Sequence, residues 1–306
     1  MNLEGVHHVT AITADGQSNA DFYVDVLGLR LVKKTVNQDD PTAYHLFYAD
    51  EDASAGADIT FFEYRGATPG RAGDGMVNRV IWRVGSAESI SFWAARLNSR
   101  GVELSATDDG RLLFADPEGL GHELLVDDTD DPSLAARHPE IDPEHALRGF
   151  GGVRAFASDP TASADLLEGL GFSGGPEEWE TRGEKRGGAY IFEEPPEGRG
   201  VPGAGTVHHV AWAGELGQEE AWRERVIEAG GRPTEVIDRF YFRSIYFREP
   251  SGVLFEIATL GPGFTVDEPA ESLGQKISLP PDYEHLRERV EAELVPIVDP
   301  RSRHEA

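Results

Sequence analysis

The chain repeats itself, and this repetition constrains its fold more than any other feature of the sequence. Residues 3–15 (LEGVHHVTAITAD) match residues 147–159 (LRGFGGVRAFASD) without a gap. Residues 75–82 (GMVNRVIW) match residues 205–212 (GTVHHVAW), and both lead to a stretch of the form F-x-x-P-x-G-x-x-x-E. Self-similarity of this kind is typical of a fold built from repeated structural units.

Four modules follow from the matches, each expected to be a βαβββ unit. They cover approximately residues 3–64, 76–128, 147–194 and 206–259. Each opens with a short apolar strand, continues into a helical pattern and returns through further strands. Gly28 and Gly101 stand where the first two helices should end, because glycine favours the left-handed cap.

A unit of about 50 residues is too small to close a hydrophobic core alone, so we expect the modules to pair. Pairing in chain order gives one domain at residues 1–140 (modules 1 and 2) and another at 141–262 (modules 3 and 4). The expected class is α+β, with each domain a cupped, barrel-like mixed sheet that carries its helices outside. Residues 127–143 form the expected linker, and residues 263–306 a tail with a helix that packs on the domains, across the second one.

The charge balance is strongly acidic, with 55 acidic against 28 basic residues and a formal net charge of -27. This excess disfavours nucleic acid and anionic membranes as partners. The acidic residues are spread along the chain, which indicates a solvated surface. We interpret this as halophilic adaptation to a salt-rich cytoplasm, and an ordinary acidic protein is the alternative.

The sequence contains neither a long apolar segment nor cysteine. No run of 18 apolar residues occurs, and the start MNLEGVHHVT lacks the features of a secretion signal, so we expect a cytoplasmic protein. The absence of cysteine excludes disulfides and thiolate ligands. Any metal must therefore be bound by His, Asp or Glu.

Two histidine pairs, His7–His8 and His208–His209, stand in matched strands. Neighbouring side chains of a strand face opposite sides, so one member of each pair can point into the concave face of the sheet. Glu256 lies in the apolar strand VLFEIATL, where an ionised carboxylate is costly unless it is paired or binds a cation. Two imidazoles and one carboxylate are typical of non-haem iron(II) oxygenases, although histidines of the core or the surface are the alternative.

The repeat also provides an internal control for this site. The other two modules carry Gly152, Arg79 and Glu123 at the matched positions, so both histidines are lost there. We expect one complete site and one inactive site, in which the guanidinium of Arg79 takes the space of the metal. The alternative is an exposed Glu123.

The sequence resembles the ring-cleaving dioxygenases that act on hydroquinones and chlorinated hydroquinones, the para-diol branch of the vicinal oxygen chelate superfamily. The resemblance covers nearly the whole chain and lies in the segments GVHHVTAIT, GTVHHVAWA, DRFYFRSIYFREPSGVLFEIAT, GPGF and LGQKISLPPDYE. It implies that the second histidine of each pair and the last-strand glutamate, His8, His209 and Glu256, bind iron(II). The alternation of faces alone leaves the member of each pair open.

The resemblance also implies that Tyr246, Arg239, His7 and Thr10 line the substrate pocket. Tyr246 can donate a hydrogen bond to bound oxygen or to a substrate oxygen, and Arg239 can stabilise an anionic substrate or intermediate. Packing and a surface ion pair are the alternative roles for these two. No role is expected for the histidines without a matched partner, among them His45, His122, His138 and His285.

The expected function is insertion of O2 into a small aromatic para-diol, with one hydroxyl and O2 bound side by side at Fe(II). Zinc, manganese or nickel can replace iron in such a site. A glyoxalase-type isomerase or lyase is the first alternative, and it would use Glu63 as a fourth ligand. A non-catalytic small-molecule binding protein is the second. Neither the ring substituents nor homo-oligomer formation follows from the sequence.

Overall fold

Two mixed sheets of eight strands carry the structure, a computed structural model that describes residues 1–303. The first sheet has the order β14-β15-β16-β13-β1-β4-β3-β2. Its strands are β1 (Val6–Thr13), β2 (Arg30–Asn37), β3 (Asp40–Ala49), β4 (Asp58–Glu63), β13 (Val207–Gly214), β14 (Ile237–Asp238), β15 (Phe242–Arg248) and β16 (Leu254–Pro262). The first sheet therefore contains the first and the last of the four modules.

The second sheet has the order β10-β11-β12-β9-β5-β8-β7-β6 and is made from the two inner modules. Its strands are β5 (Val77–Val84), β6 (Leu104–Ala106), β7 (Leu112–Ala115), β8 (Gly121–Val126), β9 (Phe150–Phe156), β10 (Ser173–Gly174), β11 (Glu178–Arg182) and β12 (Gly187–Glu193). Every module has the order strand, helix and three strands, so the predicted α+β fold of four βαβββ units is confirmed.

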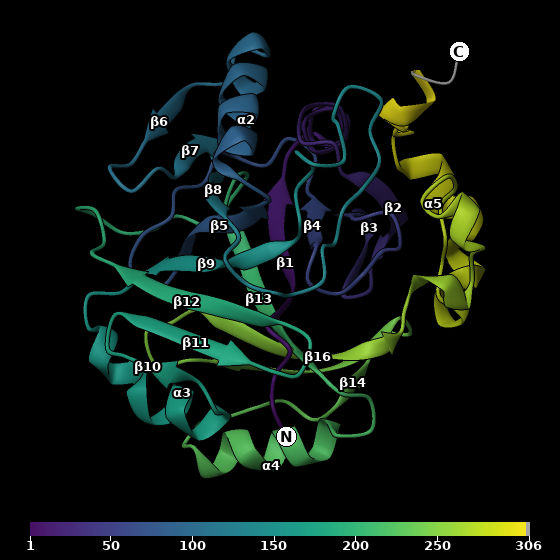
Figure 1. Ribbon diagram of the computed structural model, residues 1–306. Helices are drawn as coiled ribbons and strands as arrows, with labels where there is room; N and C mark the ends of the chain where they lie inside the picture. Colours follow the sequence, from purple (N-terminus) through teal and green to yellow (C-terminus); the bar gives the residue numbers. More distant parts are fainter. Residues whose placement is uncertain (304–306) are drawn as a thin grey trace.

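The helices lie outside the sheets. They are α1 (Gly16–Ala20), which continues as a π-helical turn over Asp21–Val26, α2 (Ala87–Ser99), α3 (Ala164–Leu170), α4 (Glu219–Glu228) and α5 (Arg287–Glu293). Short 3-10 turns stand at Pro160–Ser163, Phe264–Val266, Ala270–Ser272, Pro281–Leu286 and Pro300–Arg303. In Figure 1, α3 and α4 lie below the sheets and α2 lies above β8. No helix within residues 1–303 has the length and apolar character needed to span a membrane.

The glycines at the ends of the first two helices adopt the expected left-handed conformation, with φ of 74° at Gly28 and 76° at Gly101. Each stands two residues beyond the last helical residue, Val26 or Ser99. Side chains there would strain the backbone, so glycine ends both helices.

The pairing of modules differs from the expected order. Module 1 shares its sheet with module 4 through the antiparallel strands β1 and β13, in which Val9 lies opposite Val210. Module 2 joins module 3 through β5 and β9, in which Val80 lies opposite Val153. Modules 1 and 2 therefore do not share a sheet, and neither do modules 3 and 4. Division of the chain into folding units at 1–140 and 141–262 stays a prediction.

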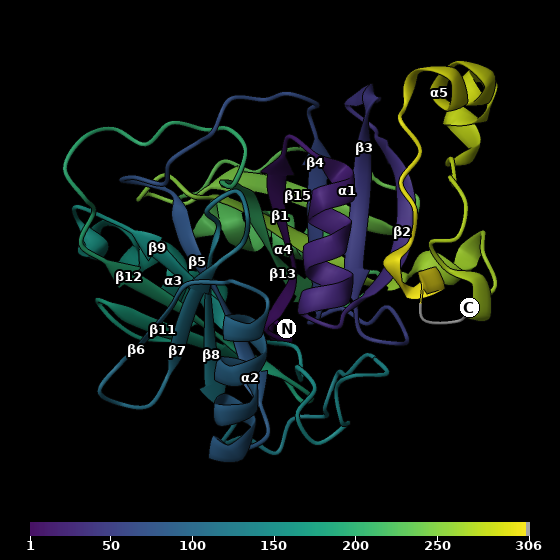
Figure 2. The same ribbon diagram turned by 90° about the horizontal axis from the view of Figure 1, so that it is seen from above.

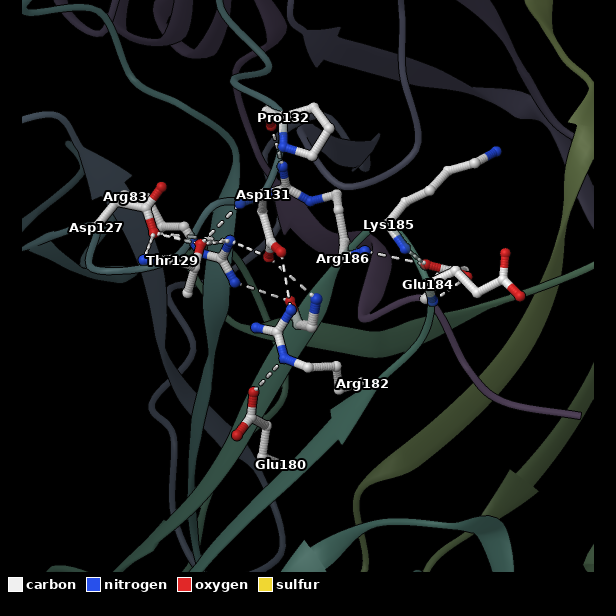
Figure 3. Close-up of polar contacts among 12 residues, drawn as sticks. Arg83, Asp127, Thr129, Asp131, Pro132, Glu180, Arg182, Glu184, Lys185 and Arg186 are labelled. Atoms are coloured by element: carbon white, nitrogen blue, oxygen red, sulfur yellow. Dashed lines mark hydrogen bonds and ion pairs between the residues drawn. The ribbon is translucent and has the colours of Figure 1, made fainter.

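The acidic segment 127–143 is only partly the solvated linker that the sequence indicates. The carboxylate of Asp131 accepts hydrogen bonds from Arg83 at 2.5 Å, from Arg182 at 2.8 Å and from the backbone N–H of Gly187 at 3.2 Å (Figure 3). Burial alone would raise the pKa of Asp131, but the two guanidinium groups hold it well below its usual value. Asp131 therefore attaches the linker to both modules of the second sheet.

The C-terminal tail packs mainly on the first module, and its start also contacts module 4, where the Tyr241 hydroxyl donates to Asp267 at 2.9 Å. Figure 2 shows it running beside β2, and Lys34 forms an isolated parallel bridge with Ile277. The fully buried Lys33 binds Glu268 and, at 2.8 Å, Asp267. Two of the four lysines of the chain thus hold the tail against the outer strand of the first sheet. Residues 304–306 of the expected tail lie outside the described residues.

Candidate metal centre

Three side chains from three adjacent strands converge at the centre of the first sheet. Nε2 of His8 on β1 lies 3.2 Å from Nε2 of His209 on β13. Oε2 of Glu256 on β16 lies 3.3 Å from the His8 nitrogen and 2.9 Å from the His209 nitrogen. All three side chains are buried, with exposed fractions between 0% and 4%. Two nitrogens and a carboxylate oxygen therefore point at one place inside the protein.

The strand register explains this convergence. Ala211 lies opposite His8 in the β1–β13 pair and opposite Glu256 in the β13–β16 pair, so the three residues form a row across the sheet. His209 precedes Ala211 by two residues and shares its face. The methyl group of Ala211 leaves the space between His8 and Glu256 that the imidazole of His209 enters.

His7 fixes the tautomer of His8 from the side away from the cluster. Nε2 of His7 lies 3.1 Å from the carbonyl oxygen of Thr259, which can only accept, so this nitrogen donates. Burial, followed by the nearby His8, lowers the pKa of His7 to about 3, so the ring is neutral and its Nδ1 is an acceptor. Nδ1 of His8, at 2.9 Å, must then donate, which leaves a lone pair on Nε2 of His8 toward the cluster.

The second pair repeats this arrangement, with Nδ1 of His208 at 2.8 Å from Nδ1 of His209. Burial lowers the pKa of both rings, that of His208 to about 4. In both pairs the second histidine points its Nε2 to the cluster, and the first histidine contacts the Nδ1 of the second. Such outer contacts are typical of metal-binding histidines, because they fix the ring orientation and the tautomer.

The Glu256 carboxylate has the environment of a ligand. Neither of its oxygens has a hydrogen-bond partner among the described residues, although both are fully buried. Oε2 instead faces the ring nitrogens of His8 and His209. A buried carboxylate of this kind is costly unless a cation compensates its charge. Within residues 1–303, this is the one group of three such donors close enough to hold a single metal ion.

The position of a fourth protein ligand is occupied by threonine. Ala211, two residues after His209, lies opposite Glu256, and Thr10, two residues after His8, lies opposite Thr60. Thr60 is therefore the counterpart of Glu256 in the first module. Glu63 lies three residues further along β4, on the other face, where it accepts a hydrogen bond of 2.8 Å from the backbone of Gly16. The structure does not bring Glu63 to the site.

A cavity of about 410 Å³ opens in front of the three side chains. Phe47, Phe62, Tyr241 and Phe242 provide much of its apolar wall. An aromatic ring fits such a wall, and apolar surfaces with a few polar groups are typical of small-molecule sites.

Of the four pocket residues that the sequence indicates, Arg239 and Tyr246 line the cavity. Nε of Arg239 donates to the Tyr246 hydroxyl at 3.2 Å, and its two terminal nitrogens bind Asp39 at 2.9 and 3.0 Å. His7 and Thr10 are not among the residues that line the cavity: His7 contacts His8 from outside, and Thr10, on the same face as His8, bonds Thr60 at 2.7 Å. The sequence missed His45, which does line the cavity.

In the second sheet, arginines surround the carboxylate that corresponds to Glu256. Glu123 is 1% exposed and accepts hydrogen bonds from Arg154 at 2.6 and 3.0 Å, from Arg111 at 3.0 Å and from Arg79 at 3.4 Å. The predicted pairing of Glu123 with Arg79 is therefore present but is the longest of these contacts. Gly152, which replaces a ligand, has no side chain, and a Cβ there would lie 2.1 Å from the Ala189 carbonyl oxygen. The positive charges of three guanidinium groups thus compensate the negative charge of Glu123.

Replacing Glu123 with alanine should lower stability and leave the metal centre intact. The change leaves the guanidinium groups of Arg154, Arg111 and Arg79 without their buried partner. We expect the free energy of unfolding to fall by about 2–3 kcal/mol, at the low end for a broken buried ion pair because the arginines are partly exposed. Urea unfolding measures the change. Loss of bound metal in the same variant would contradict the separation of the two sites.

The fold of paired βαβββ modules with a His-His-Glu cluster in a cupped sheet defines a class of metal-binding proteins, and comparisons with known proteins agree. Residues 5–124 match the family model described as the Glyoxalase/Bleomycin resistance protein/Dioxygenase superfamily. A Bacillus subtilis (strain 168) protein, "Putative ring-cleaving dioxygenase MhqA", is 40% identical over 97% of this chain and 100% of its own. The chain belongs to this superfamily, and to its group of ring-cleaving dioxygenase relatives.

One further relative and two solved structures are also similar to this chain. The Sphingobium indicum protein "Chlorohydroquinone/hydroquinone 1,2-dioxygenase" is 32% identical over 94% of this chain and 95% of its own. A crystal structure described as a "putative dioxygenase" from Bacillus subtilis superposes with a TM-score of 0.90 at 38% identity, covering 97% of this chain and 98% of that one. Glyoxalase I from Zea mays shares the fold alone, with a TM-score of 0.57 at 15% identity, over 83% of this chain and 92% of that one.

Proposed function

We propose that the protein is an iron(II)-dependent dioxygenase that cleaves the ring of a hydroquinone-type para-diol. The observation that carries this proposal is the set of three ligands, His8, His209 and Glu256, with Thr60 where a fourth would stand. Three protein ligands on one side of a metal leave positions for the substrate and for O2. Iron(II) bound there would take up both and pass electrons from the ring to oxygen.

The relatives support the substrate class. The Sphingobium indicum relative is named for chlorohydroquinone and hydroquinone, and three Bacillus subtilis relatives are named for ring cleavage. All four match at least 94% of this chain, so the likeness includes the cavity as well as the metal centre. An aromatic ring also fits the apolar cavity in front of the three ligands.

Tyr246 and Arg239 are proposed to act on the reacting atoms. Burial, followed by the charge of Glu256, raises the pKa of Tyr246 far above neutrality, so its hydroxyl remains a proton donor. Its oxygen accepts from Arg239, which leaves the O–H free to donate to a substrate or oxygen atom in the cavity. Arg239 is anchored by Asp39 and presents its positive charge to an anionic substrate.

The isomerase and binding-protein alternatives have less support. A glyoxalase-type site would use a fourth protein ligand, and Glu63 is turned to the opposite face while Thr60 takes the matched position. A protein that only binds a small molecule has no need for a buried carboxylate without hydrogen-bond partners between two imidazoles.

The proposal is tested by anaerobic reconstitution with iron(II), followed by measurement of oxygen uptake on a panel of diols. We expect one O2 consumed per ring opened, with a new ultraviolet absorbance from the open-chain product. The matched control is the same protein loaded with zinc, which occupies the ligands and has no redox chemistry. Isomerisation of a thiol adduct without oxygen uptake would support the glyoxalase-type alternative instead.

A further inference from the structure

His45 on β3 is a cavity residue that the metal centre does not use. Its side chain lines the same cavity as His8, His209 and Glu256, and it is half-buried. β3 is separated from β1 by β4 alone, so His45 reaches the cavity from the side opposite to Tyr246 on β15. The ring is held between Phe47, with centroids 3.9 Å apart, and Phe62, with centroids 4.4 Å apart.

The orientation of the His45 ring is fixed through one of its two nitrogens. Nε2 lies 2.9 Å from the hydroxyl oxygen of Thr60, which lies 2.7 Å from that of Thr10. With Nε2 engaged by Thr60, Nδ1 remains for a partner in the cavity. Burial lowers the pKa of His45, so the imidazole is neutral and Nδ1 is either a donor or an acceptor. A hydroxyl group can satisfy both forms, because it donates and accepts.

Three other polar groups of the cavity wall form hydrogen bonds within the protein. Asn37 donates to the Tyr64 hydroxyl at 3.0 Å, and Gln38 donates to the backbone oxygen of Arg239 at 2.8 Å. Asp39 binds the Arg239 guanidinium through both oxygens. Among the lining residues with a polar atom left for a ligand, which also include Thr35 and His208, His45 and Tyr246 lie on opposite walls of the cavity.

We propose that Nδ1 of His45 hydrogen-bonds the hydroxyl of the diol that does not bind the metal, and so selects substrates with two separated hydroxyl groups. The inference rests on the proposed function and deepens it. A para-diol reaches the metal with one oxygen only, so its other oxygen needs a partner on the protein. The aromatic neighbours Phe47 and Phe62 hold the imidazole rigidly, which makes this contact specific.

The test measures binding without turnover, using iron(II) protein under anaerobic conditions. Hydroquinone and phenol are compared by titration calorimetry with the wild type, with His45→Ala, with His45→Gln and with His285→Ala, an exposed histidine in the tail. We expect His45→Ala to weaken hydroquinone binding about tenfold and to leave phenol, which lacks the second hydroxyl, unchanged. His45→Gln should recover part of the loss, and His285→Ala should match the wild type.

Each outcome decides the proposal. Equal weakening for hydroquinone and phenol in His45→Ala, with full metal content and unchanged thermal stability, would show that His45 only shapes the cavity and would overturn the inference. Unchanged binding of both ligands would overturn it as well. If the wild-type iron(II) protein binds neither ligand and consumes no O2, the proposed function itself fails, which is a separate result.

Discussion

Replacing His8, His209 or Glu256 with alanine is expected to strip the metal from the protein and to abolish oxygen uptake. Each change removes one of three donors, and the two that remain cannot hold a divalent ion against water in this buried position. The activity loss should exceed the roughly 10–100-fold that follows loss of an outer contact to a metal ligand. Metal content per chain after dialysis, measured by plasma mass spectrometry, gives the first readout.

The matched control for these variants is Glu123→Ala, which removes the equivalent carboxylate from the second sheet. It should retain one metal ion per chain, as should the wild type, because one site alone keeps its histidines. Circular dichroism checks that all four variants remain folded. Two metal ions of equal affinity per wild-type chain would refute the assignment of a single centre.

A strong preference for para-diols over catechols is the second large expected effect. A catechol can chelate iron through both oxygens, whereas a para-diol reaches it with one and must be held at the other end by the protein. We expect kcat/KM for hydroquinone, chlorohydroquinone and methylhydroquinone to exceed that for catechol and 3-substituted catechols by on the order of 100-fold, since hydrogen-bonding sites discriminate strongly. Oxygen uptake with the iron(II) enzyme measures the ratio.

Faster turnover of catechols would contradict the para-diol assignment and leave the metal centre untouched. The same measurement on His45→Ala tests the role of this residue. Because the contact to the distant hydroxyl is lost, the ratio of kcat/KM for para-diols to that for catechols should fall. A ratio that does not change in this variant would place the discrimination elsewhere, for example at Tyr246.

The sequence indicates the three ligands because two independent signals coincide in them. His8 and His209 stand in strands that the repeat makes equivalent, and Glu256 is a charge within an apolar strand. The structure places them within 3.3 Å of one another. The repeat also contained an unused signal, since Arg154 occupies the position of Thr10 and is the principal partner of Glu123.

Other features were beyond the reach of sequence patterns. Alternation of apolar residues predicts strands but not their partners, so the pairing of β1 with β13 was missed. His45 has no counterpart in the repeat and no tandem neighbour, and its position in the cavity depends on the curvature of the whole sheet. The place of His7 likewise depends on the register shift between Val6 and His8 in β1, which a sequence pattern does not predict.

The joining of the first and last modules in one sheet has a consequence for biosynthesis. His8 and His209 are separated by 201 residues, and β1 has no antiparallel partner until β13 has left the ribosome. Modules 2 and 3 lie between them in the chain and can complete their own sheet first. Closing so long a loop is slow compared with local folding. β1 can pair with β4 of its own module early, but His8 meets His209 and Glu256 only after β13 and β16 have been made, so the cluster of three ligands is complete only near the end of synthesis.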